Sequence, residues 1–143
     1  MKKLLLIVPV IALIAASAGA HCQIPCGIYD DAARITEMKE HVTTIEKSMK
    51  NITSLQPTSP QNNNQLIRWV NNKEAHADKL STIVTAYFLT QRIKPDAENY
   101  TAKLKALHGM MLSAMKAKQS VDLEQVKKLR ALIAEFETLY HTH

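Results

Sequence analysis

The sequence predicts an all-α protein, and more closely a four-helix bundle that follows a short N-terminal segment. Apolar residues recur at a 3-4-3-4-3 spacing, which places them on one face of a helix. After Asp31 almost no segment alternates apolar and polar residues as a half-buried strand does. Stretches rich in proline and polar residues separate the periodic segments. Four helices that each carry one apolar face bury those faces most simply around a common core.

Each helix is predicted from one apolar stripe. The stripes are Ile35, Met38, Val42, Ile45, Met49 and Ile52; Leu66, Val70, Ala77, Leu80, Val84 and Tyr87, interrupted by Lys73; Ala97, Tyr100, Leu104, Leu107, Met111 and Ala114; and Val126, Leu129, Ile133, Phe136 and Tyr140. Asp30 or Asp31 is predicted to cap the first helix and Ser120 the fourth. The stretch LQPTSPQNNN at 55–64 is predicted to be a loop, and Pro95 to open the third helix.

Residues 1–20 are predicted to be a leader that is removed. Lys2 and Lys3 precede thirteen mostly apolar residues, and residues 18–20 (AGA) fit an A-x-A cleavage signal. Thirteen residues are too few to span a bilayer of about 30 Å as a helix, so a membrane anchor is the minor interpretation. Cleavage by a signal peptidase or another processing protease leaves a chain that begins at His21, with a bundle domain at 30–143. We expect a periplasmic or secreted protein; the alternative is a cytoplasmic protein with a cleaved propeptide.

The charge and the remaining histidines indicate a chemically quiet body. Removing Lys2 and Lys3 lowers the formal net charge from +5 to +3, and no run of Lys and Arg is interleaved with aromatic residues. A nucleic-acid partner is therefore not expected, nor a membrane after cleavage. The remaining histidines, expected to be surface or lightly buried side chains and not ligands, are scattered at His41, His76, His108, His141 and His143.

The cleavage site would create a set of metal donors. A free His21 carries an α-amine and an imidazole, Cys22 adds a backbone nitrogen and a sulfur, and Cys26 returns a second sulfur. Pro25 and Gly27 would help the chain to turn. Free α-amines titrate near 7.7 to 8.0 and thiols near 8.5, so a bound cation displaces their protons near neutrality. Nitrogen and sulfur donors in a plane suit Ni(II) or Cu(II), whereas zinc prefers a tetrahedron. Nickel is the better candidate, because Cu(II) tends to oxidise thiolates.

The stretch HCQIPCGIY at 21–29 resembles the nickel hook of nickel superoxide dismutase, whose pattern is His-Cys-x-x-Pro-Cys-Gly-x-Tyr; every fixed position is present. KEAHADKL at 73–80 and YF at 87–88 also resemble the body of that family, so the similarity covers residues 21–143. The resemblance implies one nickel ion per subunit and a homohexamer of four-helix-bundle subunits. It further implies an oxidoreductase that converts superoxide anion to oxygen and hydrogen peroxide by Ni(III)/Ni(II) cycling.

The resemblance also assigns roles to individual residues. His21 would bind the metal through its amine and, in the oxidised state, through its imidazole. Cys22 would bind through its backbone nitrogen and sulfur, and Cys26 through its sulfur. Pro25 would shape the hook. Tyr29 would guard the open face and hydrogen-bond to small anions or water near the metal.

The same resemblance assigns roles to residues that support the metal site without binding the metal. In the family a glutamate and an arginine support the axial imidazole. Glu37 lies near the glutamate's place, although a one-residue gap after Asp31 would put Thr36 there, and His76 takes the arginine's place. The family's frequent aspartate after the first cysteine is Gln23 here.

Two other interpretations of the N-terminal segment stay open at this point. The same hook could carry nickel or copper for delivery to another protein. Alternatively, Cys22 and Cys26 could form one short disulfide in an exported bundle without a metal, as cysteine pairs in exported chains often do. The disulfide interpretation leaves the position of His21 at the cut unexplained.

Overall fold

The computed structural model describes residues 30–141. Its elements are α2 (Asp31–Ser54), α3 (Pro60–Thr82), the π-helix η1 (Ile83–Arg92), α4 (Tyr100–Gln119) and α5 (Leu123–His141). Residues 30–141 contain no β-strand. The prediction of an all-α four-helix bundle is confirmed.

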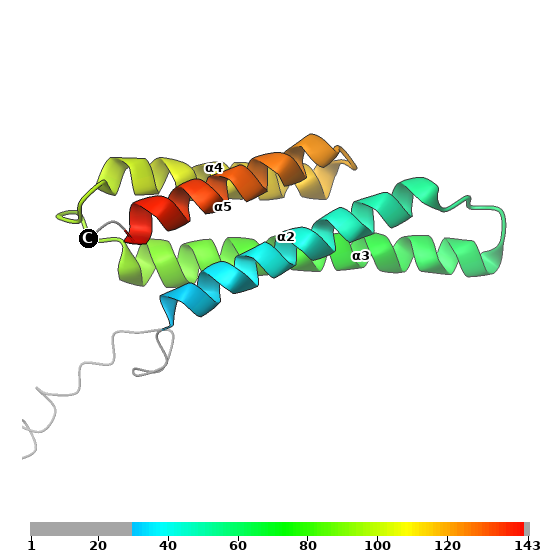
Figure 1. Cartoon of the computed structure of the whole chain (residues 1–143). Coiled ribbons are helices and arrows are strands. Elements are labelled where there is room, and N and C mark those ends of the chain that lie inside the picture. Colours follow the sequence, from blue (N-terminus) through cyan, green and yellow to red (C-terminus); the bar gives the residue numbers. More distant parts are fainter. Residues whose placement is uncertain (1–29, 142–143) are drawn as a thin grey trace, which may run out of the picture.

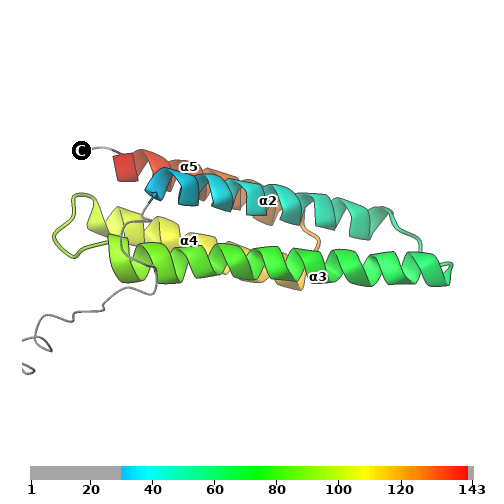
Figure 2. The same ribbon diagram turned by 90° about the horizontal axis from the view of Figure 1, so that it is seen from below.

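The helices run antiparallel in chain order, as the colour ramp in Figures 1 and 2 shows. Each packs against two neighbours: α2 and α4 both contact α3 and α5. The α2–α3 pair extends past the turn between α4 and α5, so residues 55–59 lie at one end of the bundle (Figure 1). The start of α2, the end of η1 and the end of α5 lie at the opposite end. That end is where residues 21–29 join the bundle.

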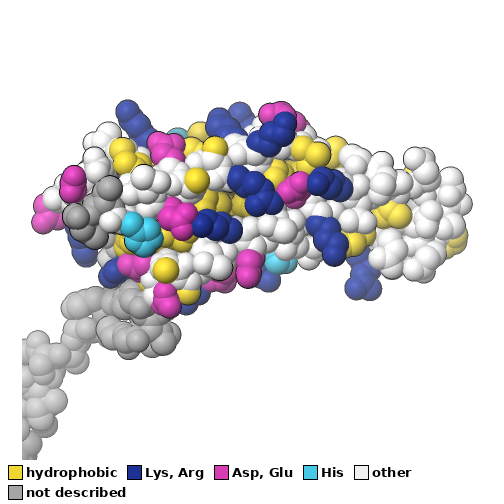
Figure 3. Space-filling model, viewed as in Figure 1, with side chains coloured by type: hydrophobic (Ala, Val, Ile, Leu, Met, Phe, Trp, Pro, Cys, Tyr) yellow, Lys and Arg dark blue, Asp and Glu magenta, His cyan; other side chains and the backbone are white. Residues whose placement is uncertain are grey.

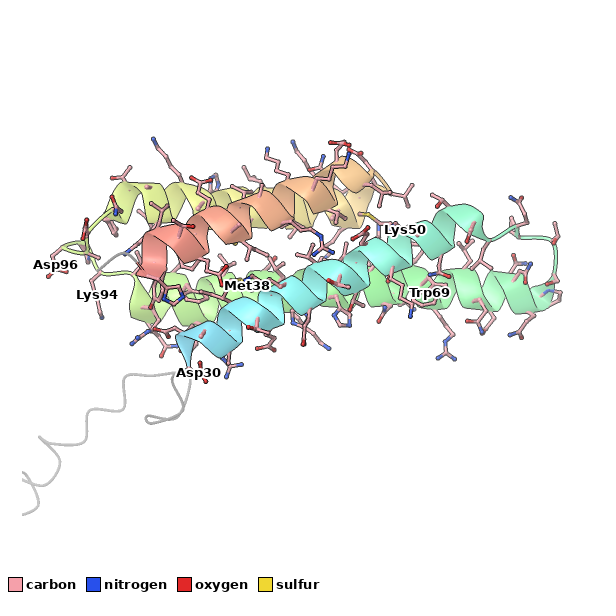
Figure 4. All side chains as sticks on the ribbon, in the orientation of Figure 1. Asp30, Met38, Lys50, Trp69, Lys94 and Asp96 are labelled. Atoms are coloured by element: carbon pink, nitrogen blue, oxygen red, sulfur yellow. The ribbon has the colours of Figure 1, made fainter. Side chains whose placement is uncertain are left out.

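The core is formed mainly by the apolar faces that the stripes predict, but Val70 of the second stripe is exposed, so the prediction is wrong at that position. Met38 on α2 is fully buried, and Figure 4 shows it on the side of α2 that faces the other helices. Aromatic side chains fill the core near the α2 start. Phe88 makes edge-on contacts with Phe136, at 4.9 Å between ring centroids, and with Tyr140, at 5.5 Å. Edge-on pairs of this kind add to the stability gained from burial alone.

The start of α2 agrees with the prediction, whereas the start of α3 lies earlier in the chain than predicted. Asp30 caps α2, because its Oδ1 accepts a hydrogen bond of 2.9 Å from the backbone N–H of Ala33. The predicted loop 55–64 is wrong in its second half, since α3 already begins at Pro60. Ser59 caps that helix and Pro60 occupies its first turn, where a missing N–H costs nothing.

The third helix begins later than predicted. Pro95 lies in a turn and not in the first turn of α4, which starts at Tyr100. The preceding residue, Asn99, has a left-handed backbone with φ of 56°, a conformation that Asn tolerates better than most residues. Along α4 the buried face is turned from the predicted stripe, so Met110 is fully buried while Met111 is only half-buried.

Lys73, the one polar interruption of the second stripe, caps the C-terminal end of a different helix, α4. Its side chain is buried, and its Nζ donates hydrogen bonds to the carbonyl oxygens of Lys118 (2.6 Å) and Ser120 (2.9 Å). It thereby satisfies carbonyls that the end of α4 leaves without helical partners. Ser120 therefore ends α4 and does not cap α5. At the start of α5, the Asp122 carboxylate accepts a hydrogen bond from a backbone N–H instead.

Charges of both signs are mixed over the face drawn in Figure 3, apart from the end that holds the α2–α3 connection. Residues 51–67, which form that end, contain no charged side chain. Among the helices that the structure describes, none is both long and apolar enough to cross a membrane.

Candidate metal centre

The residues predicted to hold the metal lie outside residues 30–141, so their prediction is not tested by the structure. They are His21, Cys22 and Cys26; Pro25 and Gly27, predicted to shape the hook, and Tyr29, predicted to guard its open face, also lie outside the described residues. The donor set fits nickel, because an α-amine, an amide nitrogen and two thiolates are four mixed donors of the kind that suit a square-planar Ni(II) ion, and the His21 imidazole adds a fifth donor for the oxidised state. Within the described residues, no group of three or more His, Cys, Asp or Glu side chains is placed to hold a metal ion.

The structure does define the surroundings of the point where this segment joins the bundle. Tyr29 precedes Asp30, and Figure 4 shows Asp30 at the same end of the bundle as Lys94 and Asp96 of the η1–α4 turn. Two polar clusters lie close to this end, one centred on Asp31 and one on His41.

The first cluster, which we call the Asp31 network, joins three elements. Tyr87 of η1 donates its hydroxyl to Asp31 Oδ1 at 2.5 Å, and Tyr140 of α5 donates to Oδ2 at 2.7 Å. Arg92 of η1 donates to Oδ2 from Nη2 at 2.5 Å and from Nε at 3.2 Å. The start of α2 is therefore tied to both η1 and α5.

The pKa values in this network follow from burial and from the shared carboxylate. Burial acts to raise the pKa of Asp31, but the hydrogen bonds from Arg92, Tyr87 and Tyr140 outweigh it and lower the value. Burial and the bond to Asp31 raise the pKa of Tyr140 to about 12. The same causes raise the pKa of Tyr87. Near neutral pH the network therefore holds one carboxylate, one guanidinium and two protonated phenols.

The second cluster brings together the two residues expected to support the metal from outside its ligand set. His41 Nδ1 lies 3.0 Å from His76 Nδ1, and His41 Nε2 lies 3.8 Å from Glu37 Oε1. Glu37 also accepts a 2.7 Å hydrogen bond from Arg34. His41 and His76, which are 35 residues apart in the sequence, thus meet in the folded bundle.

The contact between the two rings restricts their protonation. One Nδ1 must carry a proton and the other must accept it, so the bond cannot persist if both rings are fully protonated. Burial lowers the pKa of His41, and the nearby His76 lowers it further. Burial also lowers the pKa of His76, with Lys79 adding to the effect. Glu37 and Glu40 oppose the shift at His41, but do not cancel it.

We expect acid to destabilise the fold through this pair. Because the folded-state pKa values are lowered, the unfolded chain binds more protons below its own histidine pKa near 6.5, and the free energy of unfolding falls as pH drops below that value. Urea unfolding of nickel-free protein at pH 7 and pH 5 measures the loss. The variant His76→Gln should lose less stability over this interval. Equal losses in both proteins would show that the pair does not carry the effect.

A cleft of about 530 Å³ lies between α2 and the junction of α3 with η1. Arg34 and Glu37 line it from α2, and Lys79, Ile83 and Tyr87 line it from the other side. Arg34 connects the two clusters, since it bonds Glu37 and its guanidinium carbon lies 5.5 Å from the centre of the Tyr87 ring. Both clusters therefore border one cleft beside the start of α2.

A family model described as nickel-containing superoxide dismutase matches residues 16–143. The chain belongs to that family. No curated protein and no solved structure was found to match it.

Membership in the nickel-containing superoxide dismutase family establishes the activity and the cofactor. The protein is an oxidoreductase that converts superoxide to oxygen and hydrogen peroxide, and its cofactor is nickel, with one ion per subunit. The predictions of the activity and of the cofactor are confirmed.

The sequence did not indicate the role of His41 or the Asp31 network. Tyr87 and Tyr140 stood in the predicted stripes only as core residues, and nothing in the pattern indicated that their hydroxyls share one carboxylate.

Proposed function

We propose that this nickel superoxide dismutase holds its metal through His21, Cys22 and Cys26. His21 contributes its α-amine and, in the oxidised state, its imidazole. Cys22 contributes its backbone nitrogen and sulfur, and Cys26 its sulfur. The observation that carries the proposal is the stretch HCQIPCGIY, which has the residue required at every fixed position of the hook.

Cleavage after Ala20 makes this site. A peptide nitrogen must lose its proton before it can bind a metal, whereas a free amine offers a lone pair, so His21 contributes an amine donor only when the leader is removed. Pro25 and Gly27 turn the chain so that the second sulfur returns to the same ion. N-terminal sequencing of the purified protein identifies the cut.

The reaction takes two superoxide anions and two protons. One superoxide loses an electron and leaves as oxygen, and the other gains an electron and two protons and leaves as hydrogen peroxide. Bound nickel supplies the one-electron chemistry by alternating between Ni(III) and Ni(II). Tyr29 places its hydroxyl at the open face, where it hydrogen-bonds to the incoming anion or to water.

Glu37, near the place where the family has a glutamate, and His76, in the place of the family's arginine, support the His21 imidazole from outside the ligand set. His41 belongs with them, because it lies between the two in the second cluster. An arginine is always charged, whereas the His41–His76 pair is neutral at pH 7 and gains charge only in acid, because both pKa values are lowered. The support at this position is therefore sensitive to pH.

The assembly and location proposed for the mature protein are a homohexamer in the periplasm or outside the cell, after processing by a signal peptidase or a similar protease. The apolar leader favours export. Several large apolar side chains remain exposed on a single subunit, among them Ile67 and Met115, and an oligomer could cover them.

Nickel binding by cysteine variants tests the ligand set. Protein beginning at His21 should retain about one nickel ion per chain after dialysis, whereas Cys22→Ser and Cys26→Ser should each lose most of it, because a serine hydroxyl is a poor nickel donor at neutral pH. The matched control is His108→Gln, which changes an exposed ring on α4 and should keep its nickel. Full nickel retention by either cysteine variant would contradict the proposed ligands. Wild-type protein that binds nickel yet gives it up readily and leaves superoxide decay unchanged would be a carrier.

A further inference from the structure

The Asp31 network depends on the π-helical form of η1. A π-helix closes hydrogen bonds between residues five apart, as in the 3.0 Å bond from Ile93 N to Phe88 O. Residues five apart then lie nearly above one another, whereas in an α-helix they would point about 140° apart. Tyr87 and Arg92 are five apart and both reach Asp31. The local change of helix type thus brings two donors to one carboxylate.

The Asp31 network holds the backbone at Asp31 in place, and this residue is close in the chain to residues 21–29, the proposed nickel hook. At about 3.3–3.6 Å per residue, the Cα of Tyr29 lies within about 7 Å of the Cα of Asp31, and that of Cys26 within about 18 Å. Any displacement of Asp31 therefore moves the only covalent connection between the hook and the bundle. Asp30, one residue earlier, is held as the helix cap.

The network differs from the exposed ion pair that joins α2 to α5 further along the bundle. Lys39 of α2 pairs with Glu137 of α5 at 2.7 Å, about two turns further along, with both side chains more than a third exposed. Pairs of that kind contribute little to stability. Asp31 has a side chain only 19 % exposed, and its carboxylate accepts from three residues on two other elements. The Asp31 carboxylate thus joins the start of α2 to both η1 and α5 through partly buried contacts.

We propose that Asp31, held by Tyr87, Arg92 and Tyr140, is a positioning residue for the nickel hook. The proposal rests on the ligand set proposed above. The network sets the place from which the hook leaves the bundle, and so limits where the thiolates and Tyr29 can lie. Nickel affinity and the electronic environment of the ion then depend on four side chains that need not touch it.

The variant Asp31→Asn tests the positioning role, because an amide has only one oxygen and cannot accept hydrogen bonds at both positions as the carboxylate does. Tyr140 and Arg92 both donate to Oδ2, and an NH₂ group there would face two donors; the flipped amide would instead face Tyr87. We expect the dissociation constant for Ni(II), measured by competition with a chelator, to rise at least about tenfold. We also expect the electron paramagnetic resonance spectrum of the oxidised protein to become a mixture of signals.

The matched control is Glu137→Gln, which breaks the exposed Lys39–Glu137 pair between α2 and α5. It should leave nickel affinity and the spectrum unchanged, and both variants should be compared well below their melting temperatures. Should Asp31→Asn fail to fold, Tyr140→Phe removes one hydroxyl alone and should weaken nickel binding about threefold. Affinity within twofold of wild type together with an unchanged spectrum, in whichever variant folds, would overturn the inference.

The outcome is separable from failure of the ligand set itself. If nickel binding survives Cys22→Ser and Cys26→Ser, the proposed ligands are wrong. If it is lost in those variants but unaffected by the Asp31 substitution, the ligands stand and only the positioning role is wrong.

Discussion

Retaining one alanine in front of His21 is expected to slow superoxide decay at least about a hundredfold relative to protein that begins at His21. The extension converts the α-amine into an amide and so removes one donor of the proposed site outright. Loss of a group that merely supports a ligand already costs 10- to 100-fold at metal sites, so loss of a ligand should cost more. Pulse radiolysis of nickel-loaded protein measures the decay directly.

The comparison of these two proteins makes the result specific. Both proteins contain the same thiols, imidazole and bundle, so a difference in rate isolates the amine. Equal rates would mean that the amine is not a required ligand, and the proposed coordination would be wrong. Slow decay in both proteins despite tightly bound nickel would instead favour metal delivery over turnover.

The variant Phe88→Ala is expected to lower the free energy of unfolding by about 3–5 kcal/mol, the range for truncation of a buried phenylalanine. Phe88 is fully buried, and its ring makes edge-on contacts with Tyr87, Phe136 and Tyr140. Two of these rings, Tyr87 and Tyr140, are held by hydrogen bonds to Asp31, which limits how far they can move into the space that the substitution leaves. Such a loss is a large part of the 5–15 kcal/mol that stabilises a typical domain.

Chemical denaturation monitored by far-UV circular dichroism measures this loss. The control is Leu112→Ala on α4, an apolar side chain that is 43 % exposed, for which we expect a change within about 0.5 kcal/mol. A similar small change for Phe88→Ala would show that the aromatic cluster does not stabilise the bundle.

Apolar spacing predicted most of the fold. The stripes on α2 and α5 agree with the buried residues of those helices, because their period is regular and few small residues interrupt it. On α4 the agreement is weaker. Ala106, Ala114 and Ala117 are all fully or nearly fully buried there, and a helix whose buried face is rich in alanine gives little contrast between Met110 and Met111.

The helix type of η1 could not be predicted from the sequence. A π-helix arises when tertiary contacts compensate for a less favourable backbone, and those contacts here come from Asp31, more than fifty residues away. The His41–His76 pair was missed for the same reason, because its partners come from different helices. The nickel hook stays a prediction, since residues 21–29 lie outside the described residues, but its proposed donors are close together in the chain and need no tertiary contact to be recognised.

The arrangement of the bundle ends decides where the protein can be labelled for experiments. The α2 start and the α5 end lie together, because Tyr140 bonds Asp31. A polyhistidine tag at the N-terminus would block the amine, and one after α5 would bring competing imidazoles to the same end. Residues 55–59 lie at the far end, in a stretch without charged side chains. We expect an affinity tag or fluorophore inserted there to leave nickel binding unchanged, so this loop is the practical position for a label used in purification or metal titration.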